Sequence, residues 1–337
     1  MKRLSLFALA LATPVVVMAQ TTVFDDTFSG ATPASTVNVA PTAPTATSTS
    51  YQTALGGPGG SGSIATGDFT FSSSSSATIL TEIQALFANT PITLITLGDY
   101  IDISVTFRDT AGSILSSSGN QSSESLILGL FNSNGSAPLT GPNNLLTGGA
   151  AATGGVQNWQ GFIGRVISSG TGNIITRPMQ TGTTSQNQDL LFNNASSGSS
   201  FHFPTGTQLG TKSTAAANVN LTVGNTYTVD LRVTYGYNGG TGITISNALY
   251  NGTDTTTTPI YTAVNNTSGS LATAGATNSF DGFGLGWRQS AAATVSTIDI
   301  SQVLITDLVQ PVPEPASVAL VFAGGIGILA MVRRVRR

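Results

Sequence analysis

The sequence contains no cysteine and a single histidine, His202. Without cysteine the chain forms neither disulfides nor thiolate metal sites, and one histidine cannot build a multi-histidine metal site. Charged residues are also scarce, at 8% of the chain against roughly 25% in an average soluble protein. These absences exclude most familiar catalytic and metal-binding arrangements.

Apolar residues make up 40% of the 337 residues, which is enough to build a hydrophobic core. Between Gln20 and Gln310, six basic side chains stand against fourteen acidic ones, so this central part has a net charge of −8. Such a chain is repelled by a phosphate backbone, and it lacks the basic stripe that would bind one. We therefore expect no nucleic-acid partner.

The N-terminus has the pattern of a secretory signal peptide. Lys2 and Arg3 precede the uncharged run 4–17, and Val17 and Ala19 place small side chains at the two recognised cleavage positions. The sequence predicts cleavage after Ala19 and export of the mature chain. An uncleaved membrane anchor is the alternative, but the apolar run is short for one.

The C-terminus has three parts in a fixed order. A proline-rich junction contains Pro313, Glu314 and Pro315, and the uncharged stretch 316–332 follows it. Its length of 17 residues is near the lower limit for a spanning helix, so the sequence predicts a single transmembrane helix. The chain closes with four arginines that the positive-inside rule places in the cytoplasm: Arg333, Arg334, Arg336 and Arg337.

This C-terminal pattern resembles the PEP-CTERM sorting signal of Gram-negative bacteria that make extracellular polysaccharide. The resemblance implies that an exosortase, a membrane-embedded protease or transpeptidase, recognises Pro313, Glu314 and Pro315 and cleaves near them. It also implies a transient inner-membrane anchor, followed by delivery to the cell surface or the exopolysaccharide matrix. A plain single-pass anchor with a proline-rich spacer is the alternative.

The central part alternates between apolar and polar residues, most strictly in 100–108 and 227–235. A period of two is typical of a half-buried β-strand. Helical periodicity is confined to 81–88, where we expect a short helix that ends at the following Asn-Thr-Pro. Further strands are expected at 92–97, 126–131, 162–167, 219–223, 243–250, 259–264, 280–287 and 295–306.

Many short strands between Gly, Asn, Ser and Pro turns predict an all-β fold, an antiparallel β-sandwich of the jelly-roll type. We divide the chain into the signal peptide 1–19, a Thr/Ser/Pro/Gly-rich segment 20–63 with a candidate first strand, the sandwich 64–310 and the sorting signal 311–337. Low-complexity stretches such as 56–63 are expected to be loops.

The strand motifs of the central part resemble concanavalin A-like, LamG-type jelly rolls. The resemblance rests on the segments 97–107, 128–132, 161–166, 227–233 and 280–288. It implies the sandwich fold but no single activity, because this fold occurs in lectins, glycosidases, lyases and adhesive modules.

The acidic residues do not form the pattern of a glycosidase, which places two carboxylates across the glycosidic bond. The only glutamates of the central part are Glu82 and Glu124, and neither lies in a Glu-x-Asp-x-x-Glu strand. The aspartates are isolated in sequence, and we expect Asp99 to cap a turn and Asp102 to lie on a solvated strand face. His202 lacks partners for acid–base catalysis. We therefore expect a protein that is not an enzyme.

Trp159 and Trp287 are the candidate sugar-binding residues, because polar side chains flank both of them in the sequence. Core packing is the simpler interpretation, since a tryptophan buries a large apolar surface. We expect no cofactor. A structural calcium ion held by Asp25, Asp26 or Asp281 is the alternative, although no Asp-x-Asp-x-Asp loop is present.

Two functions stay open at this point, and lyase or hydrolase activity is the least favoured third. The first is an exported, non-enzymatic surface or matrix protein that an exosortase sorts and processes. The second is a carbohydrate-binding, lectin-like module that acts on extracellular polysaccharide.

Overall fold

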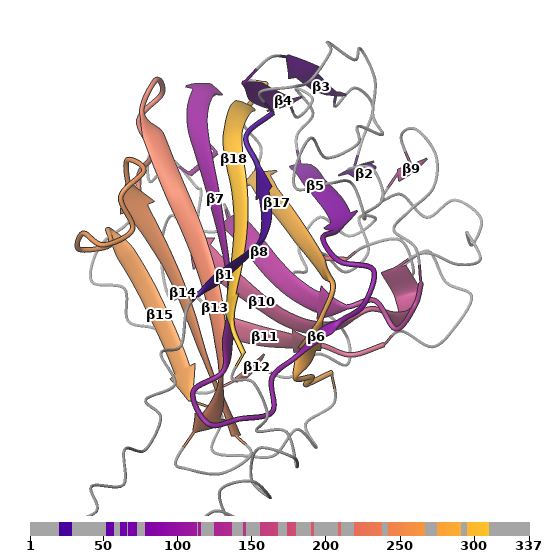
Figure 1. Cartoon of the computed structure of the whole chain (residues 1–337). Coiled ribbons are helices and arrows are strands. Elements are labelled where there is room, and N and C mark those ends of the chain that lie inside the picture. Colours follow the sequence, from indigo (N-terminus) through magenta and orange to yellow (C-terminus); the bar gives the residue numbers. More distant parts are fainter. Residues whose placement is uncertain are drawn as a thin grey trace, which may run out of the picture. The chain divides into compact units, whose positions relative to one another are not determined.

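The alternating segments form strands, and the strands form two layers (Figure 1). The computed structural model describes residues 20–28, 52–56, 61–65, 67–72, 78–112, 114–115, 125–136, 144–145, 156–167, 174–179, 190–191, 208–209, 219–237, 242–266, 275–290 and 295–309. Ala19, Glu124, His202 and the sorting signal 311–337 lie outside these residues. In the described part of the chain, no helix has the length and hydropathy needed to cross a membrane.

The first layer is an eight-stranded sheet, called sheet A here, with the order β15-β14-β13-β7-β18-β4-β3 and with β1 also paired to β18. Its strands are β1 (Thr21–Asp26), β3 (Ser61–Ala65), β4 (Asp68–Ser72), β7 (Tyr100–Ala111), β13 (Thr226–Tyr237), β14 (Gly242–Asn251), β15 (Tyr261–Asn266) and β18 (Thr297–Leu308).

The second layer, sheet C, also has eight strands, in the order β12-β11-β10-β8-β17-β5-β2-β9. Its strands are β2 (Gln52–Gly56), β5 (Thr78–Leu86), β8 (Ser125–Asn132), β9 (Asn144–Leu145), β10 (Gln160–Ile167), β11 (Ile174–Arg177), β12 (Gln208–Leu209) and β17 (Gly282–Ser290). A small separate sheet pairs β6 (Ile92–Thr93) with β16 (Ser279–Phe280). Among the described strands, only β2 and β9 pair in parallel.

The main hydrophobic core lies between the two sheets. Its members come from β7, β13 and β18 on one side and from β5, β8 and β17 on the other. Phe71 of β4 meets Trp287 of β17 edge to face, with ring centroids 4.8 Å apart. Such contacts between the layers identify the molecule as an all-β sandwich, which confirms the predicted fold class at this level.

The two most strictly alternating segments are strands, as predicted, and they pair with each other. Segment 100–108 lies in β7 and segment 227–235 lies in β13. Tyr235 is half-buried against the core, and eight apolar residues of the two strands face it with at most 3% of their surface exposed: Ile101, Ile103, Val105, Phe107, Tyr227, Val229, Leu231 and Val233.

The helix predicted at 81–88 is wrong, because this segment forms most of β5. Ile83, Ala85 and Phe87 are buried in the core, so the period that decides the structure is two. The strand pairs with β17 along its whole length. The sheet contact therefore overrides the weak local helical pattern.

Two predicted strands are wrong in whole or in most of their length. Segment 219–223 is not a strand, and of 92–97 only Ile92 and Thr93 are. The carboxylate of Asp99 accepts hydrogen bonds from the backbone N–H groups of Ile95 and Thr96, at 2.9 and 2.7 Å, which closes a turn there. Asp99 thus caps a turn, as predicted.

The N-terminal segment 20–63 contributes strands to both sheets. The predicted first strand is β1, and Phe24 and Phe28 lie in the core. The predicted loop 56–63 is wrong at its ends, because Gly56 closes β2 and β3 begins at Ser61. The first strand, β1, pairs with the last strand, β18, and Thr21 lies opposite Asp307 at one end of this pairing.

Candidate functional site

The outer face of sheet C, opposite the main core, carries a second apolar cluster. It packs Ile127, Phe131 and Ile163 of the sheet against Val156, Trp159, Leu190 and Leu191. Leu190 can pack against the sheet because position 284 is a glycine. A Cβ on Gly284 would lie 2.9 Å from the side chain of Leu190, which is too close for an unstrained contact. Both faces of the middle of sheet C are therefore covered by the chain itself.

A buried carboxylate holds Leu190 and Leu191 in place. Glu82 accepts hydrogen bonds from the backbone N–H groups of Leu190 and Leu191, at 3.0 and 2.9 Å, and from the side chain of Gln84. Burial raises the pKa of Glu82, although these hydrogen bonds and the charge of Arg177 oppose the increase. A side chain with no exposed surface cannot reach a substrate, so Glu82 has a structural role.

Neither tryptophan presents its ring to a ligand, because both are completely buried. Trp287 lies in the main core against Phe71. Trp159 lies in the outer cluster, and its Nε1–H donates to the carbonyl of Ser136 at 3.0 Å. Core packing is therefore the correct interpretation, and direct sugar stacking on Trp159 or Trp287 is wrong for this structure.

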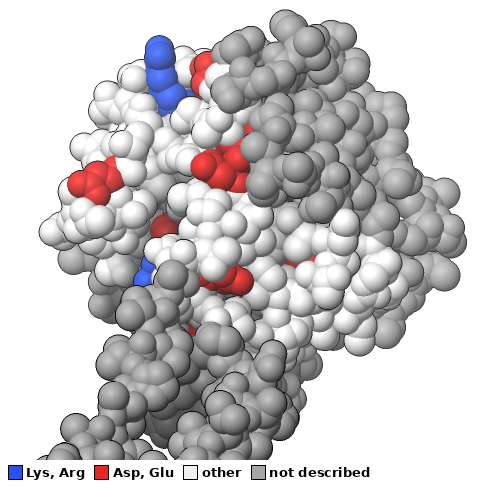
Figure 2. Space-filling view, in the orientation of Figure 1, with Lys and Arg blue, Asp and Glu red and all other residues white. Residues whose placement is uncertain are grey.

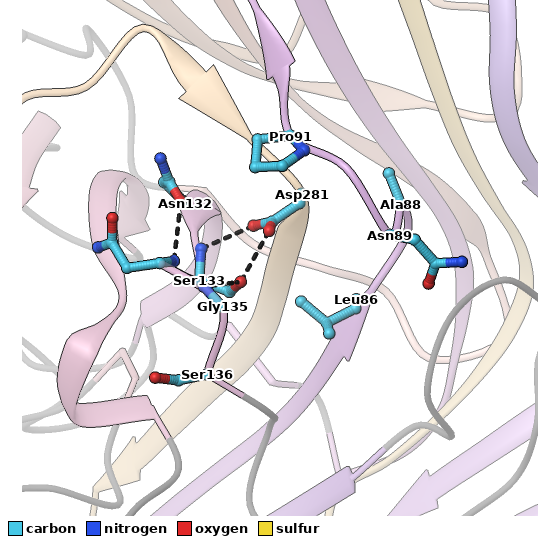
Figure 3. A pocket seen from close by; sticks show the side chains of 10 residues that line it. Leu86, Ala88, Asn89, Pro91, Asn132, Ser133, Gly135, Ser136 and Asp281 are labelled. Atoms are coloured by element: carbon cyan, nitrogen blue, oxygen red, sulfur yellow. Dashed lines mark hydrogen bonds between the residues drawn. The ribbon is translucent and has the colours of Figure 1, made fainter.

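A pocket of about 410 Å³ opens at one end of sheet C (Figure 3). Three chain segments build it: the end of β5 with the turn after it, the loop after β8, and the residue that joins β16 to β17. Figure 3 shows Leu86, Ala88, Asn89 and Pro91 on one side and the loop after β8 on the other. The remaining lining residues are Asn132, Ser133, Asn134, Gly135, Ser136 and Asp281.

Asp281 joins the two sides of this pocket. Its carboxylate accepts a hydrogen bond from the backbone N–H of Ser133 at 2.6 Å and another from the Ser133 hydroxyl at 2.7 Å. Burial raises the pKa of Asp281, and these hydrogen bonds work against the increase. Its backbone carbonyl accepts from the N–H of Phe87 at 2.8 Å. Asp281 is therefore fixed in position before any ligand arrives.

The loop after β8 is a built turn of polar residues. The side chain of Asn132 accepts from the backbone N–H of Asn134 at 2.8 Å, and Asn134 takes a left-handed conformation with φ of 50°. The Asn134 amide then donates to the carbonyl of Asn158 at 2.6 Å, and the Asn158 amide donates to the Ser136 hydroxyl at 2.9 Å. Asparagine tolerates this backbone conformation better than most residues.

A second group of polar residues lies on the outer face of sheet A. Arg232 forms an ion pair with Asp102 and stacks over the ring of Tyr100, 4.6 Å from its centroid. Burial and the neighbouring Asp102 raise the pKa of Asp230 to about 8, while Arg232 opposes the increase. The prediction that the aspartates stand alone, with Asp102 on a solvated face, is therefore wrong, because sheet register brings Asp102 and Asp230 together.

The candidate calcium residues have other partners. Asp25 accepts from the side chain of Gln302 at 2.8 Å, and Asp26 accepts from the backbone N–H of Phe28 at 2.9 Å. Within the described ranges, no three His, Cys, Asp or Glu side chains lie together as metal ligands. Asp25, Asp26 and Asp281 thus do not come together as one set of side-chain ligands.

The pocket residues other than Asp281 were not identifiable as site residues from the sequence. Asn132-Ser133-Asn134-Gly135-Ser136 has the composition of an ordinary turn. Asn89 and Pro91 lie beside it only because β5 and β8 flank β17 in sheet C. The one local signal was the single charge of Asp281 within an otherwise uncharged stretch.

In comparisons with known proteins, the chain is similar only to solved structures. No family model and no curated protein matches the chain. The lectin UEA-II complexed with galactose is 11% identical, with a TM-score of 0.37, and the match covers 82% of this chain and 98% of the lectin. The exoplasmic/lumenal domain of VIP36, bound to Ca²⁺ and Man2, is 12% identical, with a TM-score of 0.37 and coverage of 78% and 84%.

Arcelin-5, a lectin-like defence protein from Phaseolus vulgaris, is 12% identical, with a TM-score of 0.36 and coverage of 83% and 99%. TM-scores this low carry no argument about this chain. The sandwich fold therefore rests on its own strand order and core, and the function rests on its own residues.

Proposed function

We propose that this protein is an exported, non-enzymatic surface or matrix protein with a LamG-like sandwich, which an exosortase sorts and processes at its C-terminus. The proposal is carried by the ordered C-terminal pattern of Pro313-Glu314-Pro315, an uncharged stretch and an arginine cluster, together with the N-terminal signal that ends at Ala19.

The limits of the described strands are compatible with removal of both ends. The first strand begins at Thr21, after the expected cleavage at Ala19, and the last strand ends at Leu308, before Pro313. Cleavage at either place leaves every described strand intact. β18 lies between β7 and the pair β1 and β4, so the sandwich requires it after processing.

The sorting proposal is tested by fractionating cells that express the chain with an internal epitope tag and that contain or lack the exosortase. We expect matrix or surface localisation only when the enzyme is present. A variant with Glu314→Ala is expected to stay in the inner membrane, whereas Asp254→Ala, on an exposed turn, serves as the control. Identical localisation with and without the enzyme would contradict the proposal.

We further propose that the sandwich binds carbohydrate through the pocket around Asp281. The observation that carries this is the composition of the lining, where amides, hydroxyls and one carboxylate face the short apolar wall of Leu86, Ala88 and Pro91. Fixed polar groups beside an apolar surface suit the hydroxyls and the C–H faces of a sugar. A single carboxylate at the described lining favours binding over hydrolysis, which requires two.

Calorimetric titration with a panel of oligosaccharides tests this second proposal. Asn89→Ala and Asn134→Gly each remove an exposed amide, and the glycine tolerates the positive φ of position 134. We expect each variant to bind about fivefold to tenfold more weakly, since one hydrogen bond contributes about 1 kcal/mol. Asn251→Ala, at an exposed site on β14, is the control. Unchanged binding in both pocket variants would contradict the assignment of this pocket.

A further inference from the structure

We propose that the Asp281 pocket selects polysaccharides without acidic groups and rejects polyuronates. This inference rests on the proposed carbohydrate binding and names its substrate class. It follows from the charge around the pocket, where one carboxylate, that of Asp281, has no basic side chain beside it in the described lining.

The sequence around the pocket contains one charge. The segments 83–98, 125–164 and 255–287, which supply the pocket walls and their flanking chain, contain no lysine or arginine, and Asp281 is their only charged residue. Recognition of a carboxylate or sulfate in proteins relies on arginine or lysine, most often through paired N–H donors. These segments provide no such donor.

Three arginines of the two sheets have other partners. Arg177 is completely buried, and its guanidinium donates to the carbonyl of Trp159. The Nε–H of Arg165 donates to the hydroxyl of Ser125 at 2.9 Å. Arg232 pairs with Asp102 on the outer face of sheet A. No described residue that lines the pocket is cationic, so within this lining only hydrogen bonds compensate the charge of Asp281.

Basic side chains are also scarce on the face of the molecule shown in Figure 2. Acidic atoms appear there as small separate areas among uncharged residues, and basic atoms are sparse. An approaching polyanion thus meets a molecule whose central part has a net charge of −8. Within the pocket, the carboxylate of a bound uronate would lie within a few ångströms of the Asp281 carboxylate. The repulsion between these two charges weakens the binding of a polyuronate.

Asp281 has capacity left for a neutral ligand. Asp281 is only 4% exposed, and its carboxylate accepts two hydrogen bonds from Ser133 and one from its own backbone N–H, out of the about four acceptor positions that a carboxylate offers. A sugar hydroxyl can donate to a remaining position, but a uronate carboxylate cannot donate and is repelled. The group that excludes acidic sugars is thus the same group that accepts hydrogen bonds from neutral ones.

The test compares neutral gluco- and galacto-oligosaccharides with mannuronate and galacturonate oligomers of equal length. We expect the parent chain to bind the best neutral oligomer at least about tenfold more tightly at low ionic strength. Because the selectivity is electrostatic, we expect the ratio of the neutral-oligomer affinity to the uronate-oligomer affinity to decrease in 1 M NaCl, where the Debye length is about 3 Å.

Charge variants at Asn89 locate the effect. This side chain lines the pocket and is exposed, so Asn89→Lys and Asn89→Asp leave the core unchanged. We expect Asn89→Lys to lower the neutral-to-uronate selectivity by about threefold or more and Asn89→Asp to raise it. Asn251→Lys makes the same charge change on β14 and is expected to leave the ratio near that of the parent.

Each outcome decides the question. Equal affinity for both classes in the parent, or an equal effect of Asn251→Lys and Asn89→Lys, would overturn the selectivity while leaving carbohydrate binding intact. Binding of no oligosaccharide of either class would contradict the proposed binding function, and this inference with it.

Discussion

Asp102 and Asp230 lie on neighbouring strands of sheet A, close to Arg232, Tyr100 and Tyr250. Burial also raises the pKa of Tyr250, and the two carboxylates add to that increase. One cation beside two carboxylates compensates only one of them. The second carboxylate therefore keeps its proton to a much higher pH than an isolated aspartate.

We predict that stability falls as the pH rises from about 4 to about 8. The pKa of Asp230 is about 8 in the folded chain against 3.8 when it is unperturbed, so the folded state binds a proton that the unfolded state has lost. The loss is at most about 1.4 kcal/mol per pH unit. Urea unfolding between pH 5 and pH 9 measures it.

Asp230→Asn removes the titrating group but keeps a donor toward Asp102. We expect this variant to have a flatter pH profile and to exceed the parent in stability at pH 8. The control is Asp254→Asn. The hydrogen bonds of Thr256 lower the pKa of this exposed aspartate in the folded state, and the ordinary pKa of 3.8 lies below pH 5, so Asp254 is charged in both states over this range. Parallel profiles for the parent and Asp230→Asn would contradict the raised pKa of Asp230.

Individual side chains also show where sequence reasoning ends. The burial of Ile101 and Val229 follows from alternation alone, because every second residue of a strand shares a face. The closeness of Asp102 and Asp230 does not follow, since it depends on the register between strands that are more than one hundred residues apart. The pocket was missed for the same reason.

At the scale of elements, the outer face of sheet C depends on Glu82 and on glycine. Glu82 lies in β5 and holds the backbone of Leu190 and Leu191, which are the described residues that cover Gly284. The local sequence of 81–88 favours a short helix, and the contacts of β5 within the sheet make it a strand instead. Its alternation of Glu82 and Gln84 with Ile83 and Ala85 is the pattern of a half-buried strand, yet all four side chains are buried because the outer face of the sheet is covered.

We predict that Glu82→Gln destabilises the fold by about 1 to 3 kcal/mol, because an amide cannot accept as strongly from two buried N–H groups. Hydrogen exchange at the amides of Leu190 and Leu191 is expected to become at least tenfold faster. Asp299→Asn, a half-buried aspartate that accepts from the hydroxyl of Thr70, is the matched control for loss of a charge. Unchanged exchange at Leu190 and Leu191 would show that Glu82 does not hold them.

Gly282 is required by the close approach of Trp159, since a Cβ at this position would lie 2.5 Å from the indole ring. We predict that Gly282→Ala costs about 1 to 3 kcal/mol by forcing the ring to move. In a background of Trp159→Phe the same substitution is expected to cost at least about 1 kcal/mol less. Equal costs in both backgrounds would show that the ring is not the obstacle.

At the scale of the molecule, the first and the last described strands, β1 and β18, pair with each other in sheet A. The sequence predicted the all-β class and most of the long strands, because alternation and turn residues are local signals. It did not predict which strands are neighbours. The order β7-β18-β4 brings together strands from the middle, the end and the beginning of the chain.

We predict that residues 20–310 retain the stability of the full chain, because no described strand extends outside them. Deletion to residue 27 removes β1 and the buried ring of Phe24, and loss of one such ring alone costs about 3 to 5 kcal/mol. Thermal unfolding of the two truncated chains tests this. Equal melting temperatures would contradict the assignment of β1 to the core.

The most direct measurement is the intact mass of the protein recovered from the matrix of a host with the exosortase. The account predicts a polypeptide that begins at Gln20 and ends near Pro313 to Pro315, without the arginine cluster. Recovery of a secreted chain that still ends at Arg337 would contradict it.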